Sequence, residues 1–149
     1  MILPTGADSF KESLRLGIEV YHSLASLLKK KFGKSAANVG DEGGFGAPQL
    51  RDENHTLEII TEAIHNSGHE GRIDIGLDVA ASEFYDAKTN TYNLSQKIDS
   101  TERQMSPDAL LDIYDALTKK HPIVSIEDPF DQDDFSSYIK MTQRMGGRV

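Results

Sequence analysis

Segments with the period of a helix alternate with segments with the period of a strand along this chain, and that alternation limits the fold more than any other feature. The first long segment places apolar residues at spacings of three and four, which predicts a helix with one apolar stripe. Ser9 and Glu12 form a capping box at its start, and a run of lysines before Gly33 predicts its end. The stripe consists of Phe10, Leu14, Ile18, Tyr21, Leu24 and Leu28.

The middle of the chain continues the alternation. A short strand is expected to lead into Gly40, and a second helix follows, with Asp52 or Asn54 as its cap and Gly68 as its stop. The stretch RIDIGLDVA has an apolar residue at every second position, which is the period of a strand. The stretch FYDAKTNTYNL then predicts a hairpin, because tyrosines flank a polar turn.

The last part of the chain repeats the pattern. Ser106 and Pro107 open a third helix as its cap and its first residue. The stretch PIVSIEDPF predicts a buried apolar strand that ends at Pro129, and a final helix carries Phe135 and Ile139. Strands that alternate with amphipathic helices are typical of parallel α/β folds. The sequence therefore predicts an α/β fold, without an internal repeat or a linker.

An acidic residue closes each of the three predicted strands. Glu42 follows the first, Asp78 the second and Glu127 the third. In parallel α/β folds the active site lies at the carboxyl ends of the strands, so neighbouring strands bring such residues together. One acid at a strand end is usually a turn residue or a helix cap, but three at equivalent positions favour a shared site.

Composition restricts the class of protein. The 149 residues correspond to about one domain, with 38% hydrophobic and 27% charged residues, which is typical of a globular protein. A net charge of −8 argues against nucleic acid as the main partner and permits metal cations. No apolar run approaches the ~20 residues of a membrane helix, and MILPTGADSF lacks the features of a signal peptide. The absence of cysteine favours a reducing, cytoplasmic compartment.

Each of these acids also has a structural interpretation that needs no site. Glu42 fits a solvated turn, and Asp78 fits a cap on the segment that follows it. The acidic run from Glu127 to Asp134 is typical of a helix N-terminus, where carboxylates complement the dipole. His65 and His69 are interpreted as surface residues, since Gly68 separates them and no HExxH motif is present. The glycine-rich loop matches neither a Walker A motif nor GxGxxG, so a nucleotide site is not expected.

Four stretches together resemble the enolase family, the glycolytic phosphopyruvate hydratases. They are MILPTGADSF, VGDEGGF, IGLDVAASEFY and VSIEDPFDQDDF, and they occur in family order across nearly the whole chain. The resemblance implies a partial TIM-type (β/α)8 barrel, the first-to-middle part of the enolase C-terminal domain over residues 1–149. By the same resemblance, the family's N-terminal α+β domain and its later barrel strands are absent from this chain.

The resemblance also implies a reaction and a set of roles. Enolases reversibly dehydrate 2-phosphoglycerate to phosphoenolpyruvate with Mg²⁺, which stabilises the charge that develops when a proton leaves the carbon beside the carboxylate. Asp78 in GLDVAAS and Glu127 in SIEDPF match the metal-binding carboxylates, and Glu127 also lies against the substrate. Glu42 in GDEGG matches the general acid that protonates the departing hydroxyl, with Asp41 in support.

The chain departs from the family pattern in three respects. Gly46 is an extra residue, since the family reads GDEGGFAP where this chain reads GDEGGFGAP. The family's lysine base comes from a later strand and has no counterpart, because every lysine here falls in a predicted helix or turn. The third metal carboxylate of the family also lies beyond the matched stretches.

Three functions remain open from the sequence. The first is part of a Mg²⁺-dependent enolase that acts only within a complete chain, as a homodimer in the cytoplasm. The second is a truncated, non-catalytic enolase-like protein that keeps partner interactions, favoured by the missing lysine. The third is another α/β metal enzyme of the same superfamily, which acts on a different carboxylate.

Overall fold

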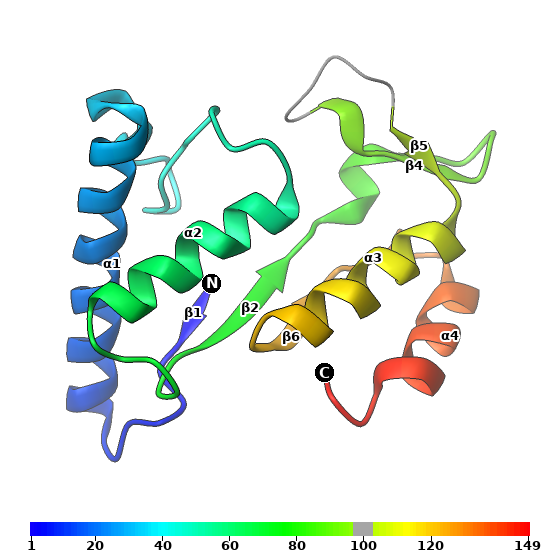
Figure 1. Cartoon of the computed structure of the whole chain (residues 1–149). Coiled ribbons are helices and arrows are strands. Elements are labelled where there is room, and N and C mark those ends of the chain that lie inside the picture. Colours follow the sequence, from blue (N-terminus) through cyan, green and yellow to red (C-terminus); the bar gives the residue numbers. More distant parts are fainter. Residues whose placement is uncertain (97–102) are drawn as a thin grey trace. The chain divides into compact units, whose positions relative to one another are not determined.

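A computed structural model describes residues 1–96 and 103–149 of the chain. Helices alternate with short strands, which confirms the α/β prediction (Figure 1). The described residues also include three 3-10 turns between the main elements, at Lys34–Ala37, Ala81–Phe84 and Leu94–Gln96. The main elements are β1 (Ile2–Leu3), α1 (Phe10–Phe32), α2 (Glu53–Asn66), β2 (Asp74–Asp78), β3 (Tyr85–Asp86), β4 (Thr91–Asn93), β5 (Gln104–Met105), α3 (Pro107–Lys120), β6 (Ile123–Glu127) and α4 (Phe135–Met145).

The chain divides into two compact units. One comprises residues 2–74, and the other comprises Met1 with residues 75–149. The first is the N-terminal unit, and the second is the C-terminal unit. Across both described ranges, no helix has the length and apolar character required to traverse a membrane.

The N-terminal unit is built on α1 and α2, and both helices begin where the sequence predicts. The Ser9 hydroxyl accepts a hydrogen bond from the Glu12 amide, and the Asp52 carboxylate accepts one from the His55 amide. Of the two predicted caps, Asp52 is the one used. These caps satisfy amides that the first helical turn leaves without an intrahelical partner. The buried core of the unit contains Leu27, Leu28, Ala36, Ile59 and Ala63.

The apolar stripe predicted for α1 is only partly buried. The prediction is confirmed for the second half of the stripe, since Leu28 is buried and Leu24 packs against the core. Its first half is exposed: Phe10 is 83% exposed and Ile18 is 47% exposed. A second apolar face, which includes Leu16, is buried instead. Periodicity identifies apolar faces, but the helix packed against α1 decides which of two faces is covered.

The strand predicted before Gly40 does not form. A 3-10 turn occupies Lys34–Ala37, and Val39 makes only a single antiparallel bridge with Phe45 in the same loop. Serine and alanine have little preference for extended structure, and a strand requires a partner for its backbone groups. In this segment that partner is the returning loop, so the expectation that Glu42 closes a parallel strand is wrong.

The C-terminal unit contains a parallel strand pair. Strand β2 pairs with β6 from Ile75 opposite Ile123 to Asp78 opposite Glu127, with an irregularity after Ile75. The two strands are joined through a hairpin and α3, as parallel strands require a crossover. The predicted hairpin is confirmed as β3 and β4, and β5 extends it to a small antiparallel sheet. Strands β2 and β6 do not belong to a closed barrel within the described residues.

One prediction about burial in this unit is wrong. Strand β6 was expected to be buried, but Val124 is 41% exposed and Ser125 is exposed as well. Within the described part of the unit, β6 has a neighbouring strand on the β2 side only. Helix α4 turns Phe135 and Ile139 outwards, at 69% and 58% exposure. Its inner face consists of Ser137, Tyr138, Met141 and Met145.

The core of the C-terminal unit is rich in aromatic side chains. Tyr92 and Phe130 are fully buried, and Tyr114 is 3% exposed. Their rings meet edge-on, with centroids 6.1 Å apart for Tyr92 and Phe130 and 5.8 Å apart for Tyr114 and Phe130. Edge-to-face geometry is favourable for aromatic pairs. This core lies under the segment that follows β6, and so it supports the residues at the end of that strand.

Candidate functional site

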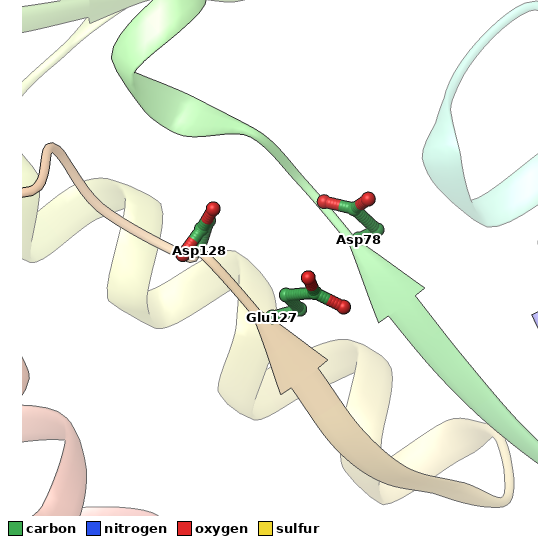
Figure 2. Close-up of side chains that lie close together, drawn as sticks. All are labelled: Asp78, Glu127 and Asp128. Carbon is green, nitrogen blue, oxygen red and sulfur yellow. The ribbon is translucent and has the colours of Figure 1, made fainter.

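Asp78 and Glu127 lie side by side at the carboxyl ends of neighbouring parallel strands. They are paired in the register of β2 and β6, and Figure 2 shows both side chains at the tips of the two strands. The amide of Val79 donates a 3.0 Å hydrogen bond to the carbonyl of Glu127, which joins the strand ends directly. The structure thus brings together two of the three carboxylates that the sequence singles out.

Asp128 joins this pair and was not predicted. One carboxylate oxygen from each of Asp78, Glu127 and Asp128 lies within 4.8 Å of the others. Asp128 has a φ of +44°, in the left-handed region that residues other than glycine rarely adopt. Its carbonyl accepts a 3.1 Å hydrogen bond from the Ala81 amide, which fastens the segment after β6 to the segment after β2.

This cluster suits a hard divalent cation. Mg²⁺ binds oxygen ligands at about 2.1 Å in octahedral geometry, so opposite ligands lie about 4.2 Å apart. The oxygens of the cluster lie within 4.8 Å of one another, which is close to the spacing of ligands around one such ion. All three carboxylates are exposed, which leaves room for the water molecules that Mg²⁺ usually retains.

The rest of the acidic run has structural roles, as its alternative interpretation expects. Asp131 accepts a 2.9 Å hydrogen bond from the Ser82 hydroxyl. Asp134 caps α4 and accepts from the Ser137 amide. Partial burial acts to raise the pKa of Asp134, but its hydrogen bonds with Ser137, Ser136 and Tyr92 outweigh burial and hold that pKa below its usual value. Glu127 and Asp128 therefore belong to the cluster, whereas Asp131 and Asp134 have turn and capping contacts.

Asp41 and Glu42 belong to the N-terminal unit, where they occupy the exposed tip of a short loop. The Gly40 amide donates to the Gly44 carbonyl at 2.8 Å, and the Gly43 amide donates to the Gly40 carbonyl at 2.9 Å. Gly43 has a φ of +79°, so the turn that presents Glu42 requires a glycine next to it. The loop therefore presents both carboxylates to solvent from a closed turn.

Aromatic side chains hold the base of this loop. The Tyr21 hydroxyl donates a 2.9 Å hydrogen bond to the Gly43 carbonyl, and the Phe45 ring lies 4.5 Å from the Tyr21 ring. Gly46 donates its amide to the Asn38 carbonyl at 3.0 Å. Gly46 thus takes part in closing the loop on the side away from Glu42.

The predictions for His65 and the described lysines are confirmed, and that for His69 is wrong. His65 is exposed, as predicted, but His69 is not a surface residue: its side chain is 11% exposed. Its Nε2 lies 2.5 Å from a Glu19 carboxylate oxygen, because α1 packs over the turn after α2. Among the described lysines, each lies in a helix or a turn, as predicted; Lys97 lies outside the described residues.

Sequence reasoning missed Asp128 because its neighbours offer a simpler interpretation. In the run EDPFDQDD it resembles one more acid ahead of a helix, and nothing in the sequence distinguishes it. The distinguishing feature is backbone geometry: the left-handed φ directs the chain so that adjacent residues place both carboxylates near Asp78. In an extended strand, neighbouring side chains point to opposite faces.

Comparison with known proteins agrees with this arrangement. The family described as "Enolase, C-terminal TIM barrel domain" matches residues 1–149. The chain is also 49% identical over 150 residues to "Enolase 2" of Hevea brasiliensis. That match covers the whole of this chain and 34% of the relative, so the chain spans about a third of the length of that protein. A chain matched from its first residue to its last, with acids at the tips of adjacent parallel strands, belongs to the enolase C-terminal domain family.

Proposed function

We propose that this chain is part of an enolase-type lyase, which reversibly dehydrates 2-phospho-D-glycerate to phosphoenolpyruvate in glycolysis. The observation that supports the proposal is the convergence of Asp78 and Glu127 at neighbouring strand ends. The whole-length family match gives this geometry its chemical context. In the complete protein, the α/β elements form part of a (β/α)8 barrel whose carboxyl end carries the site.

Asp78 and Glu127 are the proposed metal ligands, with Asp128 as a third carboxylate beside them. When bound, Mg²⁺ supplies charge stabilisation for the carbanion that forms beside the substrate carboxylate. Hard carboxylate oxygens from separate strand ends are the ligands this ion prefers. Glu127 also lies against the substrate in this proposal, and its place at a strand tip leaves it open to a small molecule.

Glu42 is the proposed general acid. The departing hydroxyl is a poor leaving group unless it receives a proton, and a carboxylic acid on a loop next to the substrate can donate one. The loop around Glu42 has the glycines that allow close approach of the backbone to a ligand. Asp41 precedes it at the loop tip and supports its orientation. Closure of such a loop excludes water from the reacting atoms.

The remaining properties are proposed for the complete protein rather than for these residues alone. They are a homodimeric assembly, a cytoplasmic location and a lysine base contributed from outside the described elements. The chain covers 34% of the relative named above, so these properties concern the longer protein. Assays with carboxylate substrates other than 2-phosphoglycerate test the proposed substrate, because related enzymes of the superfamily act on other carboxylates.

The decisive experiment compares Glu42→Gln with the unaltered protein, both produced as the longer protein to which these residues belong. Two readouts are needed: formation of phosphoenolpyruvate, and exchange of the substrate's C2 proton with deuterated water. We expect dehydration to fall by at least about 100-fold while C2 exchange persists, because the general acid serves only the second step. The matched control is Glu83→Gln, an exposed acid in the Ala81–Phe84 turn, which is expected to leave both rates unchanged. Undiminished dehydration in Glu42→Gln would contradict the assigned role.

A further inference from the structure

Tyrosine hydroxyls contact three consecutive backbone positions just after the metal cluster. The Tyr114 hydroxyl donates a 2.7 Å hydrogen bond to the Pro129 carbonyl, and the Tyr138 hydroxyl donates a 3.1 Å bond to the Phe130 carbonyl. The Asp131 amide in turn donates a 2.8 Å bond to the Tyr92 hydroxyl. These contacts are side chain to backbone, so they constrain the path of the chain rather than one rotamer.

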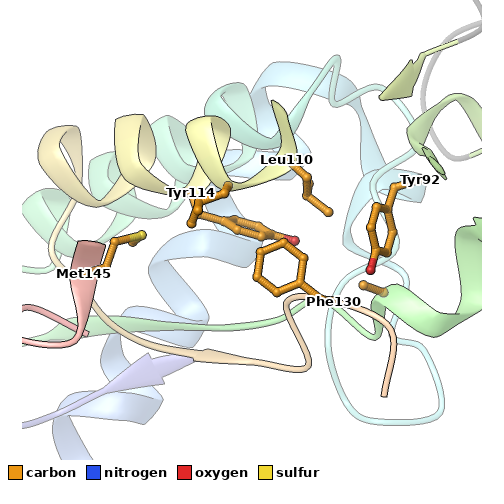
Figure 3. Close-up of a cluster of buried hydrophobic side chains, with 7 residues drawn as sticks. Tyr92, Leu110, Tyr114, Phe130 and Met145 are labelled. Carbon is orange, nitrogen blue, oxygen red and sulfur yellow. The ribbon is translucent and has the colours of Figure 1, made fainter. Parts of the chain in front are cut away.

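The three hydroxyls come from three different elements of the C-terminal unit. Tyr92 lies on β4, Tyr114 on α3 and Tyr138 on α4. Figure 3 shows the Tyr92 and Tyr114 rings beside the Phe130 ring. The segment 129–131 is therefore held from three sides by parts of the fold that are themselves fixed by the core.

The environment keeps the hydroxyls protonated. Burial raises the pKa of Tyr92 well above its usual range, and the Asp134 carboxylate acts in the same direction. Burial also raises the pKa of Tyr138, with the Asp128 carboxylate as a further cause. Neither hydroxyl loses its proton at physiological pH, so the contacts persist throughout that range.

We propose that Tyr92, Tyr114 and Tyr138 are positioning residues, which hold the segment 129–131 and thereby place the Glu127 and Asp128 carboxylates for metal binding. Tyr92, Tyr114 and Tyr138 together form the tyrosine cradle. The inference rests on the proposed function, because it assigns these residues to the metal site of that reaction. None of the three touches the metal or the substrate in this assignment.

The geometry of Asp128 is the reason that the cradle is needed. Its φ of +44° lies in a sparsely populated region, and such conformations persist only where the surroundings fix them. On one side, the Val79 and Ala81 amides hold the carbonyls of Glu127 and Asp128. On the other side, the cradle begins at the next residue, Pro129. Without the cradle the left-handed turn has support from one side only.

The test removes one hydroxyl at a time and leaves the aromatic ring in place. Tyr114→Phe removes the most buried contact, and Tyr138→Phe removes a half-buried one whose loss the fold tolerates more easily. The matched control is Tyr85→Phe, because the Tyr85 hydroxyl donates to the Asn90 side chain within the hairpin and not to the segment 129–131. Tyr85 belongs to the same aromatic cluster, with its ring 4.9 Å from that of Tyr92.

Two measurements are made on the 149-residue chain. Titration calorimetry with Mg²⁺ alone measures metal affinity, and we expect it to fall about 10-fold in Tyr114→Phe and Tyr138→Phe. Amide hydrogen exchange in the metal-free chain follows Val79 and Ala81, whose amides bond the Glu127 and Asp128 carbonyls. Loss of one supporting hydrogen bond is expected to speed their exchange about 5-fold. In Tyr85→Phe both quantities are expected to remain at wild-type values.

The outcomes separate the inference from the proposed function. If the unaltered chain binds Mg²⁺ and both variants match it in affinity and exchange, the cradle assignment is overturned and the metal site stands. If the unaltered chain binds no Mg²⁺, the metal site fails, and the exchange data alone decide whether the cradle holds Glu127 and Asp128. A change in Tyr85→Phe as large as in the other variants would also overturn the inference, since it would show a general effect of the aromatic core.

Discussion

The Tyr21 hydroxyl donates a 2.9 Å hydrogen bond to the carbonyl of Gly43, the residue that follows Glu42. Through this contact α1 of the N-terminal unit is joined to the loop that presents the proposed general acid. The Phe45 ring lies 4.5 Å from the Tyr21 ring, which adds an apolar contact to the hydrogen bond. The loop is therefore anchored beside its tip, although its two carboxylates are exposed.

Replacement of Tyr21 by phenylalanine tests this anchor. We expect the amides of Gly43 and Gly46 to exchange with solvent about 5-fold faster, because a net hydrogen-bond contribution is removed while the ring contact stays. Amide hydrogen exchange followed by NMR provides the measurement. Tyr138→Phe is the control, since its hydroxyl bonds the Phe130 carbonyl in the C-terminal unit. Equal exchange in Tyr21→Phe and the unaltered chain would show that the loop does not depend on this bond.

Removal of charge at the metal cluster tests its ligands individually. Asp78→Asn and Glu127→Gln are each expected to weaken Mg²⁺ binding at least about 100-fold, because a neutral amide is a much poorer ligand for a hard cation. Calorimetric titration with Mg²⁺ is the measurement. Asp133→Asn removes one charge from the same acidic run outside the cluster, so a similar loss in that variant would indicate general electrostatic attraction instead of a site.

Asp115 provides a prediction about stability and pH. Its side chain is 8% exposed, and its carboxylate contacts Lys119 at 2.8 Å, Arg144 at 2.9 Å, and Arg148. The hydrogen bond from Lys119, followed by that from Arg148, holds the pKa of Asp115 well below its ordinary value of 3.8. A lowered carboxylate pKa stabilises the folded chain above that ordinary value, and the contribution is lost as the pH falls through the folded-state pKa.

We therefore expect Asp115→Asn to lower the melting temperature by about 4 °C at pH 7, and by progressively less as the pH falls from about 4 towards the folded-state pKa. Circular dichroism across this pH range is the measurement. Asp112→Asn is the control, because Asp112 also contacts Arg144 but its side chain is 67% exposed, so its loss is expected to matter little at any pH. A difference between Asp115→Asn and the unaltered chain that stays constant with pH would contradict the assignment.

Replacement by alanine is expected to have opposite effects on stability at Gly6 and at Gly17. A Cβ atom at Gly6 would lie 2.8 Å from the Arg72 Cα atom, so Gly6→Ala forces backbone apart and is expected to cost about 2 kcal/mol of unfolding free energy. A Cβ atom at Gly17, inside α1, would meet only a Pro4 side-chain atom at 3.9 Å. Gly17→Ala is therefore expected to add about 0.8 kcal/mol through helix propensity. Denaturant unfolding measures both, and equal effects would refute the packing argument.

Local signals in the sequence predicted most of the secondary structure. Ser9, Asp52 and Ser106 each cap the helix they were expected to cap, because capping depends on a side chain and an amide three residues away. The strands that end at Asp78 and Glu127 were also predicted correctly, since each is a short apolar run closed by an acid.

Predictions that depended on distant partners were less successful. The exposed Phe10 and the buried His69 were assigned to the wrong environment, because their burial is decided by which surface of α1 packs against the rest of its unit. Asp128 was missed for a different reason. The role of Asp128 depends on its φ angle in the left-handed region, and a run of acidic residues does not indicate that angle in the sequence.

The continuity of the N-terminal unit in sequence has a consequence for synthesis on the ribosome. Residues 2–74 form one unit, so all of its hydrogen bonds and its core are available before β6 and α4 have been translated. Domains generally fold as units during translation, N-terminal first. We expect the turn that presents Glu42 to close early, while the Asp78 and Glu127 pair has to wait for the second half of the polypeptide. The loop that carries the proposed proton donor and the strands that carry the proposed metal ligands are thus expected to fold at different stages of translation.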